Sequence, residues 1–135
     1  MNIYIMDANA FLASVRAEPG GHVAEGLLAD PSADCLAHSV NLCEVFYDSL
    51  RRTDLPTAQQ TVSDLFALGL TERADMDQEF WPIIGQLKVQ PGRISLADCF
   101  ALALAVRTGG TLVTADHHEF DKVVPLGLCP ILFIR

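Results

Sequence analysis

Short apolar runs alternate with helical patterns along the chain. Residues 2–6 (NIYIM) form a nearly continuous apolar run that stops at Asp7, which is typical of a strand buried on both faces. Apolar residues at helical spacing follow, and the two patterns then alternate. The sequence predicts strands over residues 2–6, 34–38, 70–73, 111–114 and 131–134. It predicts helices over residues 8–17, 22–29, 39–52, 54–69, 76–89 and 95–108, and a short helical turn over residues 120–124.

Residues that start or stop helices mark several of these boundaries. Ser39 and Ser95 have the residue type and position of N-caps. Pro82 interrupts the pattern over residues 76–89, and the Gly109-Gly110 pair terminates the helix that begins after Ser95. Strands that alternate with helices indicate an α/β fold, with a central parallel sheet of about five strands and helices on both faces. In such sheets the ligand site lies beyond the carboxyl ends of the strands.

Composition sets limits on the class of protein. The 135 residues are enough for one domain, over residues 1–135, with a core of its own. The formal charge is −8, which argues against a general basic nucleic-acid binder. A polyanionic substrate would therefore have to be held locally or through metal ions. The four cysteines lack zinc-site spacing. We expect a cytoplasmic protein without a membrane segment, since no apolar stretch approaches the roughly 20 residues that cross a bilayer.

Four acids stand where the predicted fold places a ligand site. Asp7 ends the first strand, and Asp116 follows the 111–114 strand by two residues. Both should project at the carboxyl edge of the sheet. Glu44 lies on the border of the buried face of its helix, and Asp98 lies in the first turn of its helix between apolar neighbours. A charged carboxylate against an apolar stripe is costly unless something compensates it.

A divalent cation would compensate all four acids at once. Carboxylates gathered in one cleft raise one another's pKa, and oxygen-only ligation favours magnesium or manganese over zinc. Each acid also has a structural explanation. Asp7 could cap the following helix, Asp98 could belong to a capping box with Ser95, and Asp116 could be a turn residue. Glu44 could pair with an arginine of its own helix. None of these explanations accounts for all four acids meeting at one edge of the sheet.

Four ordered motifs, which together span nearly the whole chain, resemble those of the PIN-domain ribonucleases. In size the sequence is most similar to the VapC-like toxins of toxin–antitoxin pairs. The motifs are residues 7–12 (DANAFL), 39–45 (SVNLCEV), 95–103 (SLADCFALA), and 111–116 (TLVTAD) followed by 120–123 (FDKV). Each is weak alone, but the ordered set is specific. The sequence departs from the family at Ala8, where many relatives carry Ser or Thr, and in one extra residue between Asp116 and Phe120.

The resemblance implies a function, a metal and partners. The function is endonucleolytic cleavage of RNA that depends on Mg²⁺ or Mn²⁺. The partners are the RNA substrate, a second copy in a homodimer, and a small cognate antitoxin that inhibits the enzyme. The implied catalytic residues and metal ligands are Asp7, Glu44, Asp98 and Asp116.

Two other functions remain open. A PIN-fold module could bind a partner without cutting RNA. A magnesium-dependent phosphatase or receiver domain also places Asp at a strand end, although the Asp7-Ala8-Asn9 segment lacks the second acid that such phosphatases use. The basic or titratable side chains that could touch a substrate are Arg51, Lys88, Arg93, His117 and His118. For Arg51, a salt bridge with Asp48 is the simpler expectation.

Overall fold

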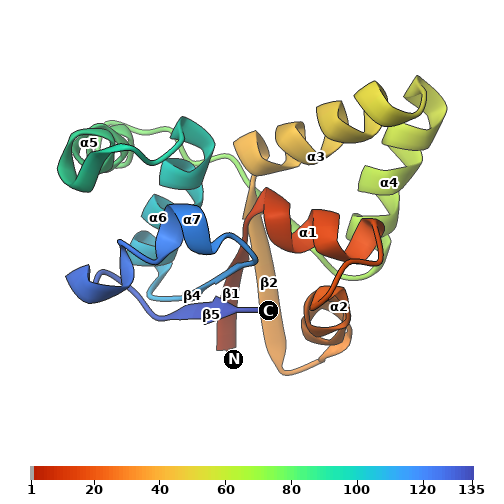
Figure 1. Ribbon diagram of the computed structural model, residues 1–135, viewed down its shortest axis with the longest axis horizontal. Coiled ribbons are helices and arrows are strands. Elements are labelled where there is room, and N and C mark those ends of the chain that lie inside the picture. Colours follow the sequence, from red (N-terminus) through yellow and green to blue (C-terminus); the bar gives the residue numbers. More distant parts are fainter. Residues whose placement is uncertain (1) are drawn as a thin grey trace.

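Five parallel strands form one central sheet in the computed structural model, which describes residues 2–135 (Figure 1). The strands are β1 (Asn2–Met6), β2 (Ala33–His38), β3 (Thr71–Arg73), β4 (Thr111–Thr114) and β5 (Ile131–Phe133). Their order across the sheet is β3-β2-β1-β4-β5, and every neighbouring pair is parallel. Strand β1 is central and is buried towards its end, as its apolar run predicts. The expected α/β class and five-strand parallel sheet are confirmed.

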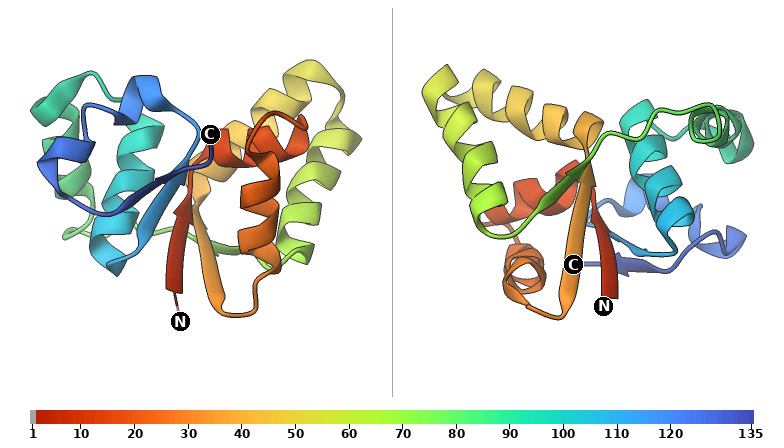
Figure 2. Two further views of the ribbon diagram at one scale, coloured as in Figure 1. Left: turned by 60° about the horizontal axis from the view of Figure 1, so that its bottom comes forward. Right: turned by 180° about the vertical axis from the view of Figure 1, so that it is seen from behind.

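Helices cover both faces of the sheet (Figure 2). They are α1 (Ala8–Val15), α2 (Gly21–Ala29), α3 (Ser39–Arg52), α4 (Leu55–Ala67), α5 (Trp81–Leu87), α6 (Leu96–Thr108) and α7 (His117–Phe120), with a π-helical turn over Lys88–Gly92 and a 3₁₀ turn over Val124–Leu126. Two apolar cores result because successive strand residues point to opposite faces. Ile5 packs with α5 and α6, whereas Met6 packs with α1 and α2.

Three boundary predictions are wrong. Helix α3 is capped by His38, whose Nδ1 accepts a hydrogen bond from Val40 N–H at 3.1 Å. Ser39 is the first helical residue, and its hydroxyl instead bonds to Glu72. Pro82 does not interrupt a helix, because α5 begins only at Trp81 and Pro82 lies in its first turn, where proline is tolerated. The expected helical turn over residues 120–124 is divided, because Phe120 ends α7 and Val124 begins the 3₁₀ turn.

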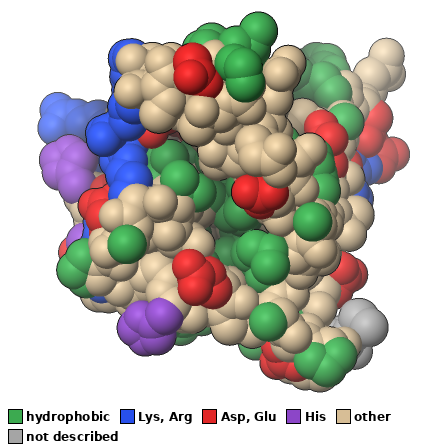
Figure 3. Space-filling model, turned by 90° about the vertical axis from the view of Figure 1, so that its right-hand side faces the viewer, with side chains coloured by type: hydrophobic (Ala, Val, Ile, Leu, Met, Phe, Trp, Pro, Cys, Tyr) green, Lys and Arg blue, Asp and Glu red, His purple; other side chains and the backbone are tan. Residues whose placement is uncertain are grey.

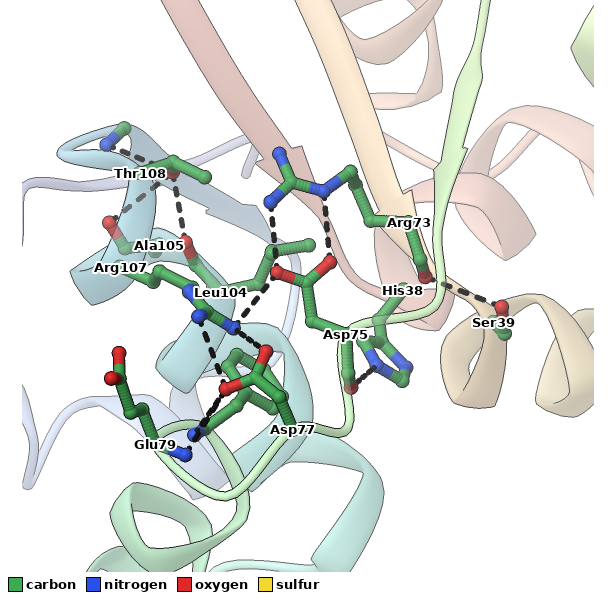
Figure 4. Close-up of polar contacts among 12 residues, drawn as sticks. His38, Ser39, Arg73, Asp75, Asp77, Glu79, Leu104, Ala105, Arg107 and Thr108 are labelled. Carbon is green, nitrogen blue, oxygen red and sulfur yellow. Dashed lines mark hydrogen bonds and ion pairs between the residues drawn. The ribbon is translucent and has the colours of Figure 1, made fainter.

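A network of four charged side chains fixes the segment between β3 and α5 (Figure 4). Arg73 donates two hydrogen bonds to Asp75, both at 2.8 Å. Arg107 of α6 reaches Asp75 at 3.1 Å and Asp77 at 2.7 Å. Two guanidinium groups thus meet two carboxylates, and their charges balance. Because Arg107 comes from α6, the network ties this segment to the helix that carries Asp98.

The topology brings the carboxyl ends of β1 and β4 side by side, with Met6 paired to Val113. Helix α1 leaves the end of β1, α3 leaves the end of β2, and α7 follows β4. Residues just beyond these strand ends therefore share one edge of the sheet. Within residues 2–135, none of the helices is both long enough and apolar enough to span a bilayer.

Candidate metal centre

Asp7 is completely buried at the end of β1. Its Oδ1 accepts a hydrogen bond from Ala10 N–H at 2.9 Å and so caps α1. Its Oδ2 accepts a hydrogen bond from the Thr114 hydroxyl at the end of β4. Burial raises the pKa of Asp7 from 3.8 to about 8, against the lowering effect of these two bonds, and nearby Asp98 and Asp116 raise it further. Asp7 therefore caps a helix and also belongs to a group of interacting acids.

Asp116 stands at the end of β4 and caps α7. Its Oδ1 accepts a hydrogen bond from Glu119 N–H at 3.0 Å. Its Oδ2 accepts one from the Asn9 amide of α1 at 3.2 Å. Thr114 ties the two strand-end acids together, because its hydroxyl donates to Asp7 and accepts from Asp116 N–H at 3.0 Å. Asn9 and Thr114 thus hold Asp7 and Asp116 at one edge.

Asp98 and Glu44 approach this edge from two helices. Asp98, in the first turn of α6, is nearly buried. Burial raises its pKa from 3.8 to about 7, and the charges of Glu119, Glu44 and Asp116 add to the shift. Burial also raises the pKa of Glu44 on α3. The side chains of Asn41 and Tyr47 lower this pKa and so offset part of the rise. Both acids are thus held where their charged forms are unfavourable.

Asn41 joins the two helices that carry Glu44 and Asp98. It lies one turn before Glu44 and is completely buried. Its Nδ2 donates to the carbonyl oxygen of Ala97, next to Asp98, at 3.1 Å. Its Oδ1 is buried and has no hydrogen-bond partner among the described residues. A buried amide oxygen of this kind costs free energy unless it is hydrogen-bonded, so it is a polar atom that a hydrated ion would satisfy.

Glu119 is an acid that the sequence analysis missed. Its Oε2 is buried, accepts no hydrogen bond within the described part of the chain, and lies 3.8 Å from Lys122 Nζ. Among the neighbouring charges, that of Glu119 raises the pKa of Asp98 most. The signal was present in the spacing of Asp116 and Glu119, which is that of a capping box. That spacing by itself indicates only the start of a helix and not a place among the acids.

The donor set fits a hard divalent cation, but the site is not pre-formed. All five acids supply oxygen, and the raised pKa values of Asp7 and Asp98 reflect the burial and repulsion that a cation relieves. Within residues 2–135, no three His, Cys, Asp or Glu side chains are gathered tightly enough to hold an ion directly. The physical reason lies in the hydrogen bonds above, since every carboxylate oxygen of Asp7 and Asp116 is turned towards a protein donor.

Basic and titratable side chains around the acids differ in how they are used. Lys88 Nζ donates to Ile94 O, and Lys122 Nζ donates to Arg93 O, so main-chain oxygens hold both ammonium groups. His117 is held on both sides, by Asp121 and by the carbonyl of Arg135, each at 2.8 Å. The Arg135 carbonyl and the Asp121 carboxylate raise the pKa of His117. His117 thus has a structural role.

The fold and the acids define an α/β protein with a carboxylate site at the carboxyl edge of a parallel sheet. The chain belongs to the PIN domain family, whose model matches residues 4–124. Nucleases of this family generally use divalent metal ions. A comparison with curated proteins gives no match.

Solved VapBC and VapC structures share the fold over most or all of this chain. VapBC2 of Rickettsia felis, bound to a DNA fragment from its promoter, is 20% identical, with 97% of this chain and 98% of that chain covered and a TM-score of 0.73. DNA-bound VapBC of Salmonella typhimurium is 15% identical, with both chains fully covered and a TM-score of 0.74. VapC20 of Mycobacterium tuberculosis, a toxin that cleaves the sarcin-ricin loop, is 13% identical over 88% and 94%, with a TM-score of 0.69.

Proposed function

We propose that this protein is a metal-dependent endoribonuclease that hydrolyses RNA phosphodiester bonds with Mg²⁺ or Mn²⁺. The observation that carries the proposal is the approach of Asp7, Asp98 and Asp116 from separate elements, in which Asp7 and Asp98 are buried and the charge of Asp116 raises the pKa of both. A cation would relieve this unfavourable burial and repulsion. Membership of the PIN family supports the reaction class. The similarity to a toxin that cleaves the sarcin-ricin loop supports RNA as substrate.

Each acid has a role in this proposal. Asp7, Glu44, Asp98 and Asp116 are the metal ligands, and Glu119 is a fifth acid beside Asp98. A bound divalent ion supplies positive charge for the phosphate and lowers the pKa of water. Asn9 and Thr114 orient the strand-end carboxylates. Asn41 links α3 to α6 and so fixes the positions of Glu44 and Asp98 relative to each other. Asp98, with a pKa of about 7 in the metal-free protein, can hold a proton at neutral pH and release it when a cation arrives.

The experiment that tests the function is a nuclease assay on structured RNA with and without manganese. The 135-residue protein should produce internal cuts only when the metal is present, and EDTA should stop them. The two alternative functions predict different results. A binding module without activity would bind RNA or a protein but leave the RNA intact. A phosphoryl-transfer domain would release phosphate from small phosphate esters and spare the RNA chain.

Glu119→Gln should weaken both metal binding and cleavage, each by about tenfold or more, the effect of removing a group that supports metal ligands. The amide keeps the shape of the carboxylate but loses its charge. Calorimetric titration with Mn²⁺ measures the first effect and RNA cleavage the second. Asp121→Asn, two residues further on and exposed, is the matched control and should bind and cut like the parent. Parental affinity for manganese in Glu119→Gln would remove Glu119 from the site.

We further propose that the protein is a cytoplasmic toxin, forms a homodimer and is bound by a small antitoxin. The similarity to VapBC toxin–antitoxin structures supports this assignment. An apolar groove of about 990 Å³ beside α5 and α6 gives a surface for a protein partner. Val89 at its edge is 77% exposed. Burying apolar surface of this kind drives protein association. The groove is lined by Pro82, Ile83, Gly85, Gln86, Leu87, Val89, Gln90, Val106, Leu126 and Leu128.

Light scattering at micromolar concentration should give the mass of a dimer, twice 14.7 kDa. Val106→Glu would place a charge in the apolar groove and should shift the mass towards the monomer if the groove is the dimer interface. Leu55→Glu, at another exposed apolar position, on α4 and outside the groove, is the control. A parent protein that scatters as a monomer across the concentration range would contradict the homodimer.

A further inference from the structure

Three of the nine basic side chains converge on one buried acid, Asp48 of α3. Arg16, at the end of α1, donates a hydrogen bond to Asp48 Oδ2. Arg51 Nη2 lies 3.1 Å from Oδ1, and Arg52 Nε lies 3.4 Å from Oδ2. Burial alone would raise the pKa of Asp48, but the three arginines hold it below its ordinary value. Arg16 also lies 3.7 Å from Glu18, which Arg135 Nη2 approaches at 3.9 Å, so four basic side chains face two carboxylates.

This excess of positive charge distinguishes the cluster from the network in Figure 4, in which Arg73 and Arg107 are balanced by Asp75 and Asp77. The balanced network has no charge left for a ligand. In the Asp48 cluster, Arg51 and Arg52 are 68% and 56% exposed. A guanidinium group has five N–H donors, and each of these two uses few of them on Asp48. Their remaining donors face solvent in a chain whose formal charge is −8.

The arginines of this cluster border a hollow in which a phosphate could be bound. A hollow of about 210 Å³ lies between α1, α3 and α4, and Arg16 and Arg52 are at its wall. The hydroxyl groups of Thr53 and Thr61 on its wall donate to the carbonyl oxygens of Ser49 and Thr57, so the guanidinium groups are the donors that a phosphate would use. The Nε of Arg16 is buried and has no hydrogen-bond partner among residues 2–135. Figure 3 looks onto this side of the molecule and shows a hollow with hydrophobic side chains, and Lys and Arg side chains gathered near one of its edges.

Tyr47 connects the cluster to the acids along α3. Tyr47 is 46% exposed, and the Arg51 guanidinium carbon lies 5.8 Å from the centroid of its ring. The Tyr47 side chain also lowers the pKa of Glu44, three residues earlier. Seven residues separate Glu44 from Arg51, which is two helical turns or about 10 Å along the axis. An aromatic ring next to arginines is the combination that binds single-stranded nucleic acid, by stacking and by phosphate contact.

We infer that Tyr47, Arg51 and Arg52 form a binding strip for single-stranded RNA beside the acids, with phosphates on the guanidinium groups and a base on the Tyr47 ring. The inference rests on the proposed function and names how its substrate is held. Arginine suits the task because its planar fork matches phosphate oxygens. Because the formal charge of the chain is −8, a polyanion has to be bound at a locally positive site, and the strip provides one. Its alignment with Glu44 favours RNA over an acidic protein segment.

The test measures binding of a fluorescein-labelled, 12-nucleotide oligoadenylate RNA by anisotropy, in EDTA so that no cleavage occurs. Arg51→Gln/Arg52→Gln should raise Kd about tenfold at 0.1 M salt and flatten the slope of log Kd against log salt by about 1.4, because each phosphate contact on a single strand contributes about 0.7. Arg16 still pairs with Asp48 in this variant. Tyr47→Phe should bind like the parent, whereas Tyr47→Leu should lose about fivefold or more. Arg73→Gln controls for loss of positive charge elsewhere.

The outcomes separate this inference from the nuclease proposal. An unchanged Kd and salt slope in Arg51→Gln/Arg52→Gln would overturn the strip, even if the parent cuts RNA with manganese. Lost binding in that variant, with no cleavage by the parent, would support the strip and overturn the nuclease. A parent that does not bind the RNA at all would overturn the strip, whereas the nuclease proposal is decided by cleavage of structured RNA with manganese. Polyglutamate is the second probe. If its affinity falls in the double variant while RNA affinity does not, the strip is a docking site for acidic protein and the RNA inference is wrong.

Discussion

Asp98→Asn should reduce RNA cleavage by about 100-fold or more, the effect of removing a group that stabilises charge in the transition state, while the fold stays intact. The helix cap at this position uses the main chain, since Ser95 Oγ accepts from Asp98 N–H at 3.2 Å. The substitution therefore leaves the cap in place. It removes one of several repelling charges, so the metal-free protein should keep its stability or gain some.

The measurements are cleavage rate with manganese and melting temperature in EDTA. If the carboxylate of Asp98 served only the helix, its loss would lower stability by about 0.5–2 kcal/mol, the range for lost caps, and activity would stay at the parental level. The two roles thus move activity and stability in opposite directions. Asp64→Asn, at an exposed acid of α4, is the control. An Asp98→Asn protein that melts earlier but cuts at the parental rate would end the catalytic assignment.

Raising the pH from 6 to 9 should lower the melting temperature of the metal-free protein by about 5–10 °C. The pKa values of Asp7 and Asp98 are raised on folding to about 8 and about 7. For acids with raised pKa, the folded state binds protons more tightly than the unfolded state does. Their contribution is complete below the unfolded value near 3.8 and is lost as the pH rises through 7 and 8. A loss of roughly 2 kcal/mol in a domain of this size gives the stated shift.

Manganese should reverse this loss. A cation that binds only the folded state at 100 times its dissociation constant adds about 2.7 kcal/mol, and its effect should be larger at pH 9 than at pH 6, because the carboxylates must be ionised to bind it. Thermal melts at both pH values, with EDTA and with Mn²⁺, measure the effect. Asp98→Asn should flatten the pH dependence, and Asp64→Asn should not. Identical melting curves at both pH values and with both additives would rule out a metal site at these acids.

Much of the fold follows from local patterns in the sequence. The run NIYIM is typical of a strand buried on both faces, and the 111–114 strand and the helix after Ser95 are similarly explicit. Alternation of the two patterns implies a parallel sheet, and a parallel sheet implies a site at its carboxyl edge. The sequence pattern alone is therefore enough to place Asp7 and Asp116 together. It does not fix the ends of weaker elements, because the starts of α3 after His38 and of α5 at Trp81 depend on tertiary neighbours.

Only the tertiary structure decided how the acids and bases are used. Burial, which raises the pKa of Asp7 and Asp98, is a property of packed layers and has no local signature. Glu119 joins the acids because α7 brings its charge close enough to raise the pKa of Asp98. The sequence alone correctly indicated that Arg51 pairs with Asp48, since i,i+3 spacing brings them together. It could not show Arg16 arriving from α1, 32 residues away, because long-range contacts depend on how the layers pack.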